Sequence, residues 1–328
     1  MSDTAAAPQL SVIIPCFNEE AVLPILRPRL DQTLGGLGVS WEVIFVDDGS
    51  LDRTLELLAA AHAANPRYKV LGLSRNFGHQ AAVSAGLAYA SGDAVAILDA
   101  DLQDPPEVLG QCLERWREGY EVVFAVRRAR KENALKRAAY STFYRLLSRI
   151  ADIDIPLDSG DFCLLDRRVA DALRSMRERN IFLRGMRAWT GFRQTAVEYE
   201  RPARAAGDSK YSLRRLLRLA LDGIFAFSTF PLRLATWFGL TIVALSFLAI
   251  AFVAVWRIAG FRFMGYTAGD VPGWTGGTVA VLFLGGVQLL ILGLIGEYLA
   301  RIYAEVKSRP RWVVSRSLGF SRVPGQIE

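Results

Sequence analysis

The sequence predicts an α/β fold with a mostly parallel sheet, followed by two membrane-spanning helices. Three observations lead to this prediction. Short apolar runs alternate with helix-length segments over the first 200 residues, which is typical of a parallel sheet with helices on both faces. Carboxylate-rich clusters follow several of these runs. Two long apolar stretches without charge lie in the last 128 of the 328 residues.

Five apolar runs have the length and the β-branched content of strands. They are LSVIIP from Leu10, WEVIFV from Trp41, KVLGL from Lys69, AVAIL from Ala94 and EVVFAV from Glu121. Helix-like segments lie between them at roughly 19–34, 52–64, 79–91 and 106–118. Ligands in such sheets bind at the carboxyl ends of the strands, so we expect a binding site there.

The two apolar stretches are Thr236–Trp256 and Gly276–Gly296, each 21 residues long. At ~1.5 Å per residue a helix of this length reaches about 31 Å, enough to cross the hydrocarbon core of a bilayer. The alternative is a pair of buried core helices in a soluble protein, but both stretches exceed the usual length of such helices.

The net charge of +6 is unevenly distributed along the chain. The first 200 residues hold 24 Lys and Arg against 27 Asp and Glu, whereas the remainder holds 15 against 6. These basic residues flank the apolar stretches, and the loop between the stretches has only Arg257 and Arg262. Positive charge beside membrane spans indicates orientation and argues against nucleic acid as a partner. We expect a protein of the cell (inner) membrane with two spans, and with the catalytic domain and both termini in the cytosol.

Residues 212–231 have leucines at helical spacing on one side and arginines on the other, which predicts an amphipathic helix in the headgroup region. A surface helix of the soluble domain is the alternative, and Pro231 would end the helix just before the first span. The predicted organisation is therefore a cytosolic domain, an interfacial helix, a two-span region and a basic cytosolic tail. Their ranges are 1–210, 211–233, 234–300 and 301–328.

Three polar clusters follow predicted strands. Asn18-Glu19-Glu20 follows the first strand, Asp47-Asp48-Gly49-Ser50 the second, and the run from Asp99 to Glu107 the fourth. Each alone has a structural explanation as a turn or a helix cap. Three together at one edge of a sheet favour a functional cleft.

The pair Asp99 and Asp101, with an oxygen from Gln103, offers hard ligands suited to Mg²⁺ or Mn²⁺. The sequence has no phosphate-binding GxxxxGK[ST] loop and no GxGxxG fingerprint, and its two histidines are too few for a zinc site. It also has no GxSxG elbow. These absences disfavour a nucleotide hydrolase, a dinucleotide enzyme and a serine hydrolase.

The clusters together resemble a known family. The motifs on which this resemblance rests are Asn18-Glu19-Glu20, DDGSLDRT from Asp47, SRNFGHQAA from Ser74 and DADLQDPPE from Asp99. They resemble the inverting family 2 glycosyltransferases of GT-A (Rossmann-like) fold, and more narrowly the polyprenyl-phosphate glycosyltransferases related to dolichol-phosphate mannose synthase. DFCLL from Asp161, RPARAAGDSKYS from Arg201 and IGEYLARIYAEVKSRP from Ile295 extend the resemblance over nearly the whole chain.

The resemblance implies transfer of a sugar from a nucleotide-sugar, with UDP-glucose favoured, to a membrane polyprenyl phosphate of the undecaprenyl type. It implies a nucleotide-sugar site lined by Pro15, Asn18, Glu20, Asp47, Asp48 and Asp99. It implies a metal site at Asp99, Asp101 and Gln103, and a catalytic set of Asp99, Asp101, Asp104 and Arg127. It implies that the lipid phosphate is bound by Arg127, Arg137, Arg204 and Lys210. The expected partners are this donor, this acceptor and the lipid bilayer. Gly286, Gly293 and Gly296 of the second span are compatible both with close helix packing in a homo-oligomer and with ordinary span glycines.

Two other functions are less favoured. A processive polysaccharide synthase normally carries a Gln-x-x-Arg-Trp motif, and the nearest match here, Gln111 with Arg115 and Trp116, has a spacing one residue too long. A non-catalytic membrane scaffold that keeps a nucleotide-sugar fold would be marked by loss of the Asp99 and Asp101 pair, but both residues are present.

Overall fold

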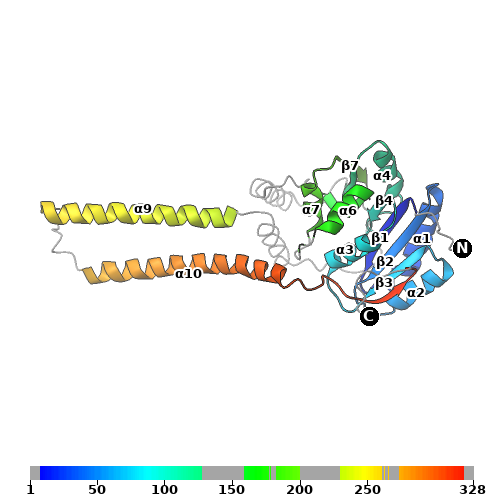
Figure 1. Ribbon diagram of the computed structural model, residues 1–328, viewed down its shortest axis with the longest axis horizontal. Coiled ribbons are helices and arrows are strands. Elements are labelled where there is room, and N and C mark those ends of the chain that lie inside the picture. The colour runs from blue at the N-terminus through cyan, green and yellow to red at the C-terminus, as the bar shows by residue number, and fades with distance from the viewer. Residues whose placement is uncertain are drawn as a thin grey trace. The chain divides into compact units, whose positions relative to one another are not determined.

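One twisted sheet forms the centre of the catalytic part of the chain (Figure 1). The computed structural model describes residues 8–127, 159–176, 178, 182–199, 230–260, 262, 265 and 273–320. These divide into two units, one of residues 1–220 with 309–328, the other of residues 221–308. The amphipathic helix predicted over 212–231 lies outside the described residues, except for Phe230 and Pro231, which open the next helix.

The described strands of the first unit are β1 (Leu10–Cys16), β2 (Trp41–Asp47), β3 (Tyr68–Leu73), β4 (Ala94–Ile97), β5 (Val122–Arg127), β6 (Ser159–Asp166), β7 (Gln194–Tyr199) and β8 (Val314–Leu318). Their order in the sheet is β7-β5-β6-β4-β1-β2-β3-β8. Pairing is parallel between β4, β1, β2 and β3, whereas β6 and β8 run antiparallel to their neighbours. The predicted mostly parallel sheet is confirmed, and each of the five predicted strands begins within about one residue of its expected position.

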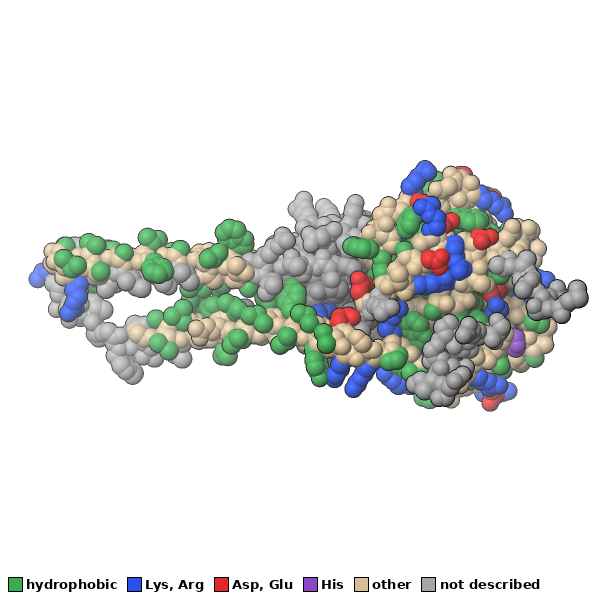
Figure 2. Space-filling view, in the orientation of Figure 1, with side chains coloured by type: hydrophobic (Ala, Val, Ile, Leu, Met, Phe, Trp, Pro, Cys, Tyr) green, Lys and Arg blue, Asp and Glu red, His purple; other side chains and the backbone are tan. Residues whose placement is uncertain are grey.

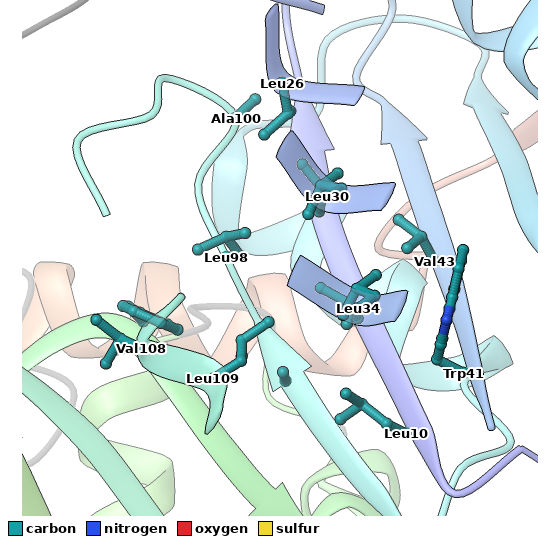
Figure 3. Packing of buried hydrophobic residues seen from close by; sticks show 14 of the residues in the cluster. Leu10, Leu26, Leu30, Leu34, Trp41, Val43, Leu98, Ala100, Val108 and Leu109 are labelled. Atoms are coloured by element: carbon teal, nitrogen blue, oxygen red, sulfur yellow. The ribbon is translucent and has the colours of Figure 1, made fainter. Parts of the chain in front are cut away.

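The described helices of this unit are α1 (Leu23–Gly36), α2 (Thr54–Ala64), α3 (His79–Tyr89), α4 (Val108–Arg117), α6 (Arg167–Ser175) and α7 (Leu183–Trp189). Buried residues of α1, α2 and α4 share one hydrophobic cluster with alternate residues of the strands. Figure 3 shows Leu26, Leu30 and Leu34 of α1 lying over β1 and β2. The i, i+4 spacing of these leucines gives the helix one apolar face, which is buried against the sheet.

Helix α3 packs against β1, β2 and β3 through the residues that α1 does not cover. A Cβ at Gly86 would lie 2.3 Å from the Cγ2 atom of Ile13, a residue absent from the α1 cluster. The missing side chain at Gly86 therefore allows the helix to approach β1 closely. Because strand side chains alternate between the two faces, helices on both sides were expected, and this expectation is confirmed.

A buried carboxylate joins strands and helices at the amino end of the sheet. The Oε1 atom of Glu42 accepts hydrogen bonds from the Ser11 hydroxyl at 2.5 Å and from the Ser91 amide and hydroxyl at 2.9 and 2.8 Å. Its Oε2 atom lies 2.6 Å from the ammonium group of Lys69. Burial alone would raise the pKa of Glu42, but the Lys69 and serine contacts lower it below its usual value.

We expect Glu42→Gln to destabilise the protein by about 2 kcal/mol at pH 7, because it removes hydrogen bonds to a charged acceptor. The pKa of Glu42 is lower in the folded chain, so its stabilisation is complete above the unfolded value of about 4.3 and is lost as the pH falls. Thermal unfolding of both proteins from pH 7 down to pH 3, well below the unfolded pKa, tests this. The difference in Tm should shrink on acidification, and a constant difference would contradict the assignment.

The last described strand returns to the sheet after the apolar helices. β8 pairs antiparallel with β3, the Ser315 hydroxyl donates to the Gly72 carbonyl at 3.0 Å, and the Ser74 amide donates to the Val313 carbonyl at 2.9 Å. Past its end, the ring of Phe320 lies 5.2 Å from that of Tyr89 in α3. Part of the segment expected to be a basic tail is therefore a strand that covers the edge of β3.

The second unit contains two long helices, α9 (Phe230–Ala259) and α10 (Gly273–Val306), which include the two predicted spans. Both are long and apolar enough to cross a membrane over Leu234–Ala259 and Phe283–Val306, judged by length and composition. Large side chains such as Trp237 of α9 and Leu289 of α10 are exposed, and Figure 2 shows hydrophobic side chains along both helices. Exposed apolar helices of this length are typical of membrane spans.

Candidate active site

The three predicted clusters lie at the same edge of the sheet. They follow β1, β2 and β4, which are neighbours in the order β4-β1-β2 and run parallel (Figure 1). Their carboxyl ends therefore meet at one edge. The antiparallel strand β6 begins at this edge, and parallel β5 ends there with Arg127.

The loop after β1 is joined to the loop after β2 by hydrogen bonds. Asn18 has a positive φ of 56°, its amide donates to the Ser50 hydroxyl at 2.9 Å, and its Oδ1 accepts from the Leu51 amide at 2.8 Å. The Oε2 atom of Glu20 accepts from the Arg53 amide at 3.1 Å. The structure thus brings Asn18 and Glu20 together with the Asp47-Asp48 turn, but their side chains bind this loop.

Asp48 holds a third loop, the one that leads into α3. Its two oxygens accept from the backbone amides of Phe77 and Gly78 at 2.7 and 2.9 Å. Burial raises the pKa of both Asp48 and Asp47, and the amide hydrogen bonds oppose this rise. Pro15, also predicted in the nucleotide site, lies in β1 opposite Val46.

Gly49, in the turn after β2, lies directly against the backbone of the loop that follows β3. Its φ is +69°, and a Cβ there would lie 2.4 Å from the backbone carbon of Arg75. Only glycine combines the left-handed conformation with such a close approach. The loops after β2 and β3 are therefore packed backbone against backbone next to the predicted nucleotide site.

The loop after β4 carries the predicted metal ligands. Asp99 and Asp101 are partly buried, and the Oδ1 of Asp101 accepts from the Gln103 amide at 3.1 Å. Leu102, between Asp101 and Gln103, has a φ of +58°, which is unusual for a side chain of this size. Burial, opposed by His79 and reinforced by Asp161, Asp104 and Asp101, raises the pKa of Asp99 to about 6.

The donor set fits a divalent cation that shares its coordination with substrate. Among the described residues, no group of three or more His, Cys, Asp or Glu side chains is close enough to hold an ion alone. Two carboxylates with a neighbouring amide oxygen suit Mg²⁺ or Mn²⁺, which commonly complete their coordination with water and substrate phosphates. The carboxylates that raise the pKa of Asp99 repel one another, and a cation would offset that repulsion.

Asp104, predicted to be catalytic, is buried and accepts a hydrogen bond from the hydroxyl of Tyr199 at the end of β7. Glu107 forms two hydrogen bonds with Arg29 of α1, at 2.6 and 2.9 Å. These contacts tie the loop to β7 and to α1. They favour a structural role for Asp104, whose catalytic assignment stays a prediction.

Three residues that were not among the predicted site residues lie beside Asp99 at the carboxyl edge of the sheet. His79, the first residue of α3, has its Nε2 atom 3.7 Å from an oxygen of Asp99 and 3.7 Å from an oxygen of Asp161 in β6. Arg184 of α7 contacts the other oxygen of Asp161 at 2.7 Å. Ile97 pairs with Cys163, so in antiparallel register the positions of Asp99 and Asp161 lie opposite each other.

Sequence reasoning gave no role to these residues, although two of them lie within motifs that carried the resemblance. The predicted site residues follow parallel strands, whereas Asp161 is the third residue of the antiparallel strand β6, which was not predicted. The motif DFCLL was the available signal.

Of the four basic residues predicted to bind the lipid phosphate, the structure describes the backbone position of one. Arg127 closes β5 at the active edge, opposite Tyr199 in the parallel register. Arg137, Arg204 and Lys210 lie outside the described residues. Their assignment to the lipid phosphate stays a prediction.

The family model for glycosyl transferase family 2 matches residues 11–174, which contain the loops after β1, β2 and β4. The chain belongs to glycosyltransferase family 2. The resemblance drawn from the motifs is thereby confirmed, and the protein is a glycosyltransferase with a GT-A-type sheet.

Relatives of this family 2 glycosyltransferase match it over nearly their full length. A glycosyltransferase of Bacillus subtilis is 45% identical over 313 residues, 95% of each chain. A prophage-derived bactoprenol glucosyl transferase of Shigella flexneri is 39% identical, with 94% of this chain and 98% of the relative covered. A prophage bactoprenol glucosyl transferase homolog of Escherichia coli is 38% identical, with 94% and 99% covered.

Among solved structures, the UDP complex of glucosyl-3-phosphoglycerate synthase from Mycobacterium tuberculosis is 20% identical, with a TM-score of 0.44. The match covers 67% of this chain and 79% of the other.

Proposed function

We propose that this glycosyltransferase transfers glucose from a nucleotide-sugar, UDP-glucose, to a membrane polyprenyl phosphate, with inversion at the anomeric carbon and with a divalent cation. The observation that carries the proposal is the pair Asp99 and Asp101 at the edge where β1, β2 and β4 end. The full-length similarity to relatives named bactoprenol glucosyl transferases supports the sugar and the lipid acceptor.

The reaction is an in-line displacement in which a lipid phosphate oxygen attacks the anomeric carbon and the nucleoside diphosphate leaves. Asp99, Asp101 and Gln103 would hold Mg²⁺ or Mn²⁺, which when bound offsets negative charge on the leaving diphosphate. A phosphate monoester with a second pKa near ~6 is largely dianionic at pH 7. The acceptor therefore needs no strong general base, and the protein's main task is to hold two anions close together.

Arginine suits the acceptor side of this task because its guanidinium binds phosphate oxygens bidentately. Arg127, which the backbone places at the end of β5, is one member of the proposed set, and Arg137, Arg204 and Lys210 are the others. Asn18, Glu20, Asp47 and Asp48 build the loops around the proposed nucleotide site.

The membrane arrangement proposed here rests on the path of the chain. The first unit is interrupted by α9 and α10 and resumes at Arg309, where the chain goes on to β8 in the same sheet. If both helices span the bilayer, they form a hairpin with the catalytic unit on one side. The excess of basic residues around the spans assigns that side to the cytosol. A long isoprenoid acceptor stays in the bilayer, at ~0.8 kcal/mol per buried CH₂, so the enzyme must work at the surface.

The near-match to a processive synthase motif has a structural explanation. The indole nitrogen of Trp116 donates to Asp166 at 2.9 Å, and Arg115 pairs with Glu118 on the surface of the fold. The Trp116 contact joins α4 to the end of β6, whereas the Arg115 pair lies within the last turn of α4. This disfavours the processive synthase as the alternative function.

The test uses the purified full-length protein in detergent, Mn²⁺, a short-chain polyprenyl phosphate and a panel of radiolabelled nucleotide-sugars. We expect UDP-glucose to label the lipid once per acceptor and EDTA to abolish the labelling. A different productive donor would overturn the assignment of glucose, and polymer growth would favour a processive synthase. If no donor labels the lipid, the proposed acceptor is wrong.

A further inference from the structure

Arg187 in α7 is a fully buried arginine next to the active edge. Its side chain is 1% exposed, and within the described part of the chain neither Nε nor Nη2 has a hydrogen-bond partner. Its guanidinium lies 5.1 Å from the ring centre of Phe124 and beside the thiol of Cys163. A guanidinium in such surroundings pays a large desolvation penalty that is only partly offset.

A second arginine on the same helix contacts the site directly. Arg184 precedes Arg187 by three residues, so both lie on one side of α7. The Arg184 Nε atom is 2.7 Å from Asp161, which is two residues before Cys163 on the same face of β6. Burial would raise the pKa of Asp161, but Arg184, His79 and Arg187 together lower it. Arg184 therefore pairs with Asp161 directly, and Arg187 adds a buried positive charge one helical turn further along α7.

Gln80 fixes the start of α7 against this carboxylate. Its Oε1 accepts from the Leu183 amide at 3.2 Å, and its Nε2 donates to Asp161 at 3.4 Å. From Asp161 the contacts continue through His79 to Asp99 at 3.7 Å each. Two carboxylates held this close repel each other unless positive charge stands near them.

Arg174 in α6 shows what an arginine with a structural role looks like in this fold. It donates to the carbonyls of Leu87 and Ala90 at the end of α3 and pairs with Asp171. Its contacts join α6 to α3 and do not involve the active edge. Among the described residues, Arg187 has no comparable set of carbonyl and carboxylate partners, so the described contacts compensate its buried charge only in part.

Resting on the proposed function, we propose that Arg187 is a positioning residue: its buried charge, with the Arg184 ion pair, keeps Asp161 beside His79 and thereby orients Asp99 toward the metal. It touches no substrate. Contacts of this kind behind a metal-binding carboxylate commonly change metal affinity or activity by about 10- to 100-fold when removed.

The test compares Arg187→Met with Arg174→Met by thermal unfolding, by transfer rate and by Mn²⁺ affinity in the presence of UDP, measured by electron paramagnetic resonance without turnover. We expect Arg187→Met to keep or raise the Tm, because methionine fills similar volume without the desolvation penalty of a buried charge, and Arg184 still pairs with Asp161. We also expect at least about a 10-fold loss in rate and a weaker Mn²⁺ affinity. Arg174→Met should lower the Tm and leave the rate per folded molecule unchanged.

Arg184→Gln provides a second variant at a less buried position. It should reduce the rate and the Mn²⁺ affinity like Arg187→Met, and Arg184→Lys should recover part of both. The proposal is overturned if Arg187→Met lowers the Tm or fails to fold, or if both variants keep wild-type Mn²⁺ affinity. A wild-type protein that binds Mn²⁺ with UDP but labels no lipid would count against the proposed acceptor alone, since the Tm and the Mn²⁺ affinity do not depend on it.

Discussion

Asp101→Asn is expected to reduce glucosyl transfer by about 10³-fold, which corresponds to about 4 kcal/mol of lost transition-state stabilisation. The change removes one negative charge from the proposed metal site and keeps the shape of the side chain. The amide oxygen of asparagine can still accept from the Gln103 amide, which Asp101 does at 3.1 Å. We therefore expect folding to be preserved while activity is lost.

Asp93→Asn is the matched control, because it makes the same chemical change at an exposed residue just before β4, at the opposite end of the strand. Transfer rates with Mn²⁺ and the Tm should be measured for both variants. Asp93→Asn should behave like the wild type. An Asp101→Asn protein with a normal Tm and a normal rate would show that the pair does not hold the metal.

Truncation after Ser308 is expected to destabilise the catalytic unit by about 3 kcal/mol or more, because it removes β8 and its packing. The loss includes the pairing with β3, the contact of Phe320 with Tyr89, and the burial of Leu318 against the core. It also uncovers the edge of β3, and an uncovered strand edge promotes association between chains. The apolar helices α9 and α10 are retained in this variant.

Truncation after Phe320 is the control, since it removes only residues 321–328 and keeps β8. Both proteins should be purified in detergent and compared by thermal unfolding and size-exclusion chromatography. We expect a lower Tm and more aggregate only for the shorter chain. Equal Tm values for the two truncations would mean that the strand adds nothing to the stability of the sheet.

The local sequence pattern was enough to predict β1 to β5, the strands that alternate with helices along the chain. LSVIIP and WEVIFV are short, β-branched and bounded by polar turns, so their identity as buried parallel strands follows from composition alone. β6 and β7 were not predicted. Neither follows the simple alternation of strand and helix, and the antiparallel β6 is recognised only through its pairing with β4 and β5.

The candidate site also contains some residues that the sequence groups together and others that only the fold brings into contact. Asp99, Asp101 and Gln103 stand in one short run, so their grouping is visible in the sequence. His79, Asp161 and Arg184 are separated by more than 20 residues from one another, and their contact depends on β6 running against β4. The same applies to Asp104, whose partner Tyr199 is 95 residues away.

The sequence by itself determined the fold class, the two apolar helices, the family and the carboxylate pair, because each depends on residues close together in the chain. The tertiary structure alone decided that a segment beyond the second helix closes the sheet, and that α7 brings Arg184 to Asp161 and buries Arg187 beside Phe124. The physical reason is that strand pairing and charge neutralisation act between residues that are neighbours in space. Their partners are set by sheet order and register, which no local pattern encodes.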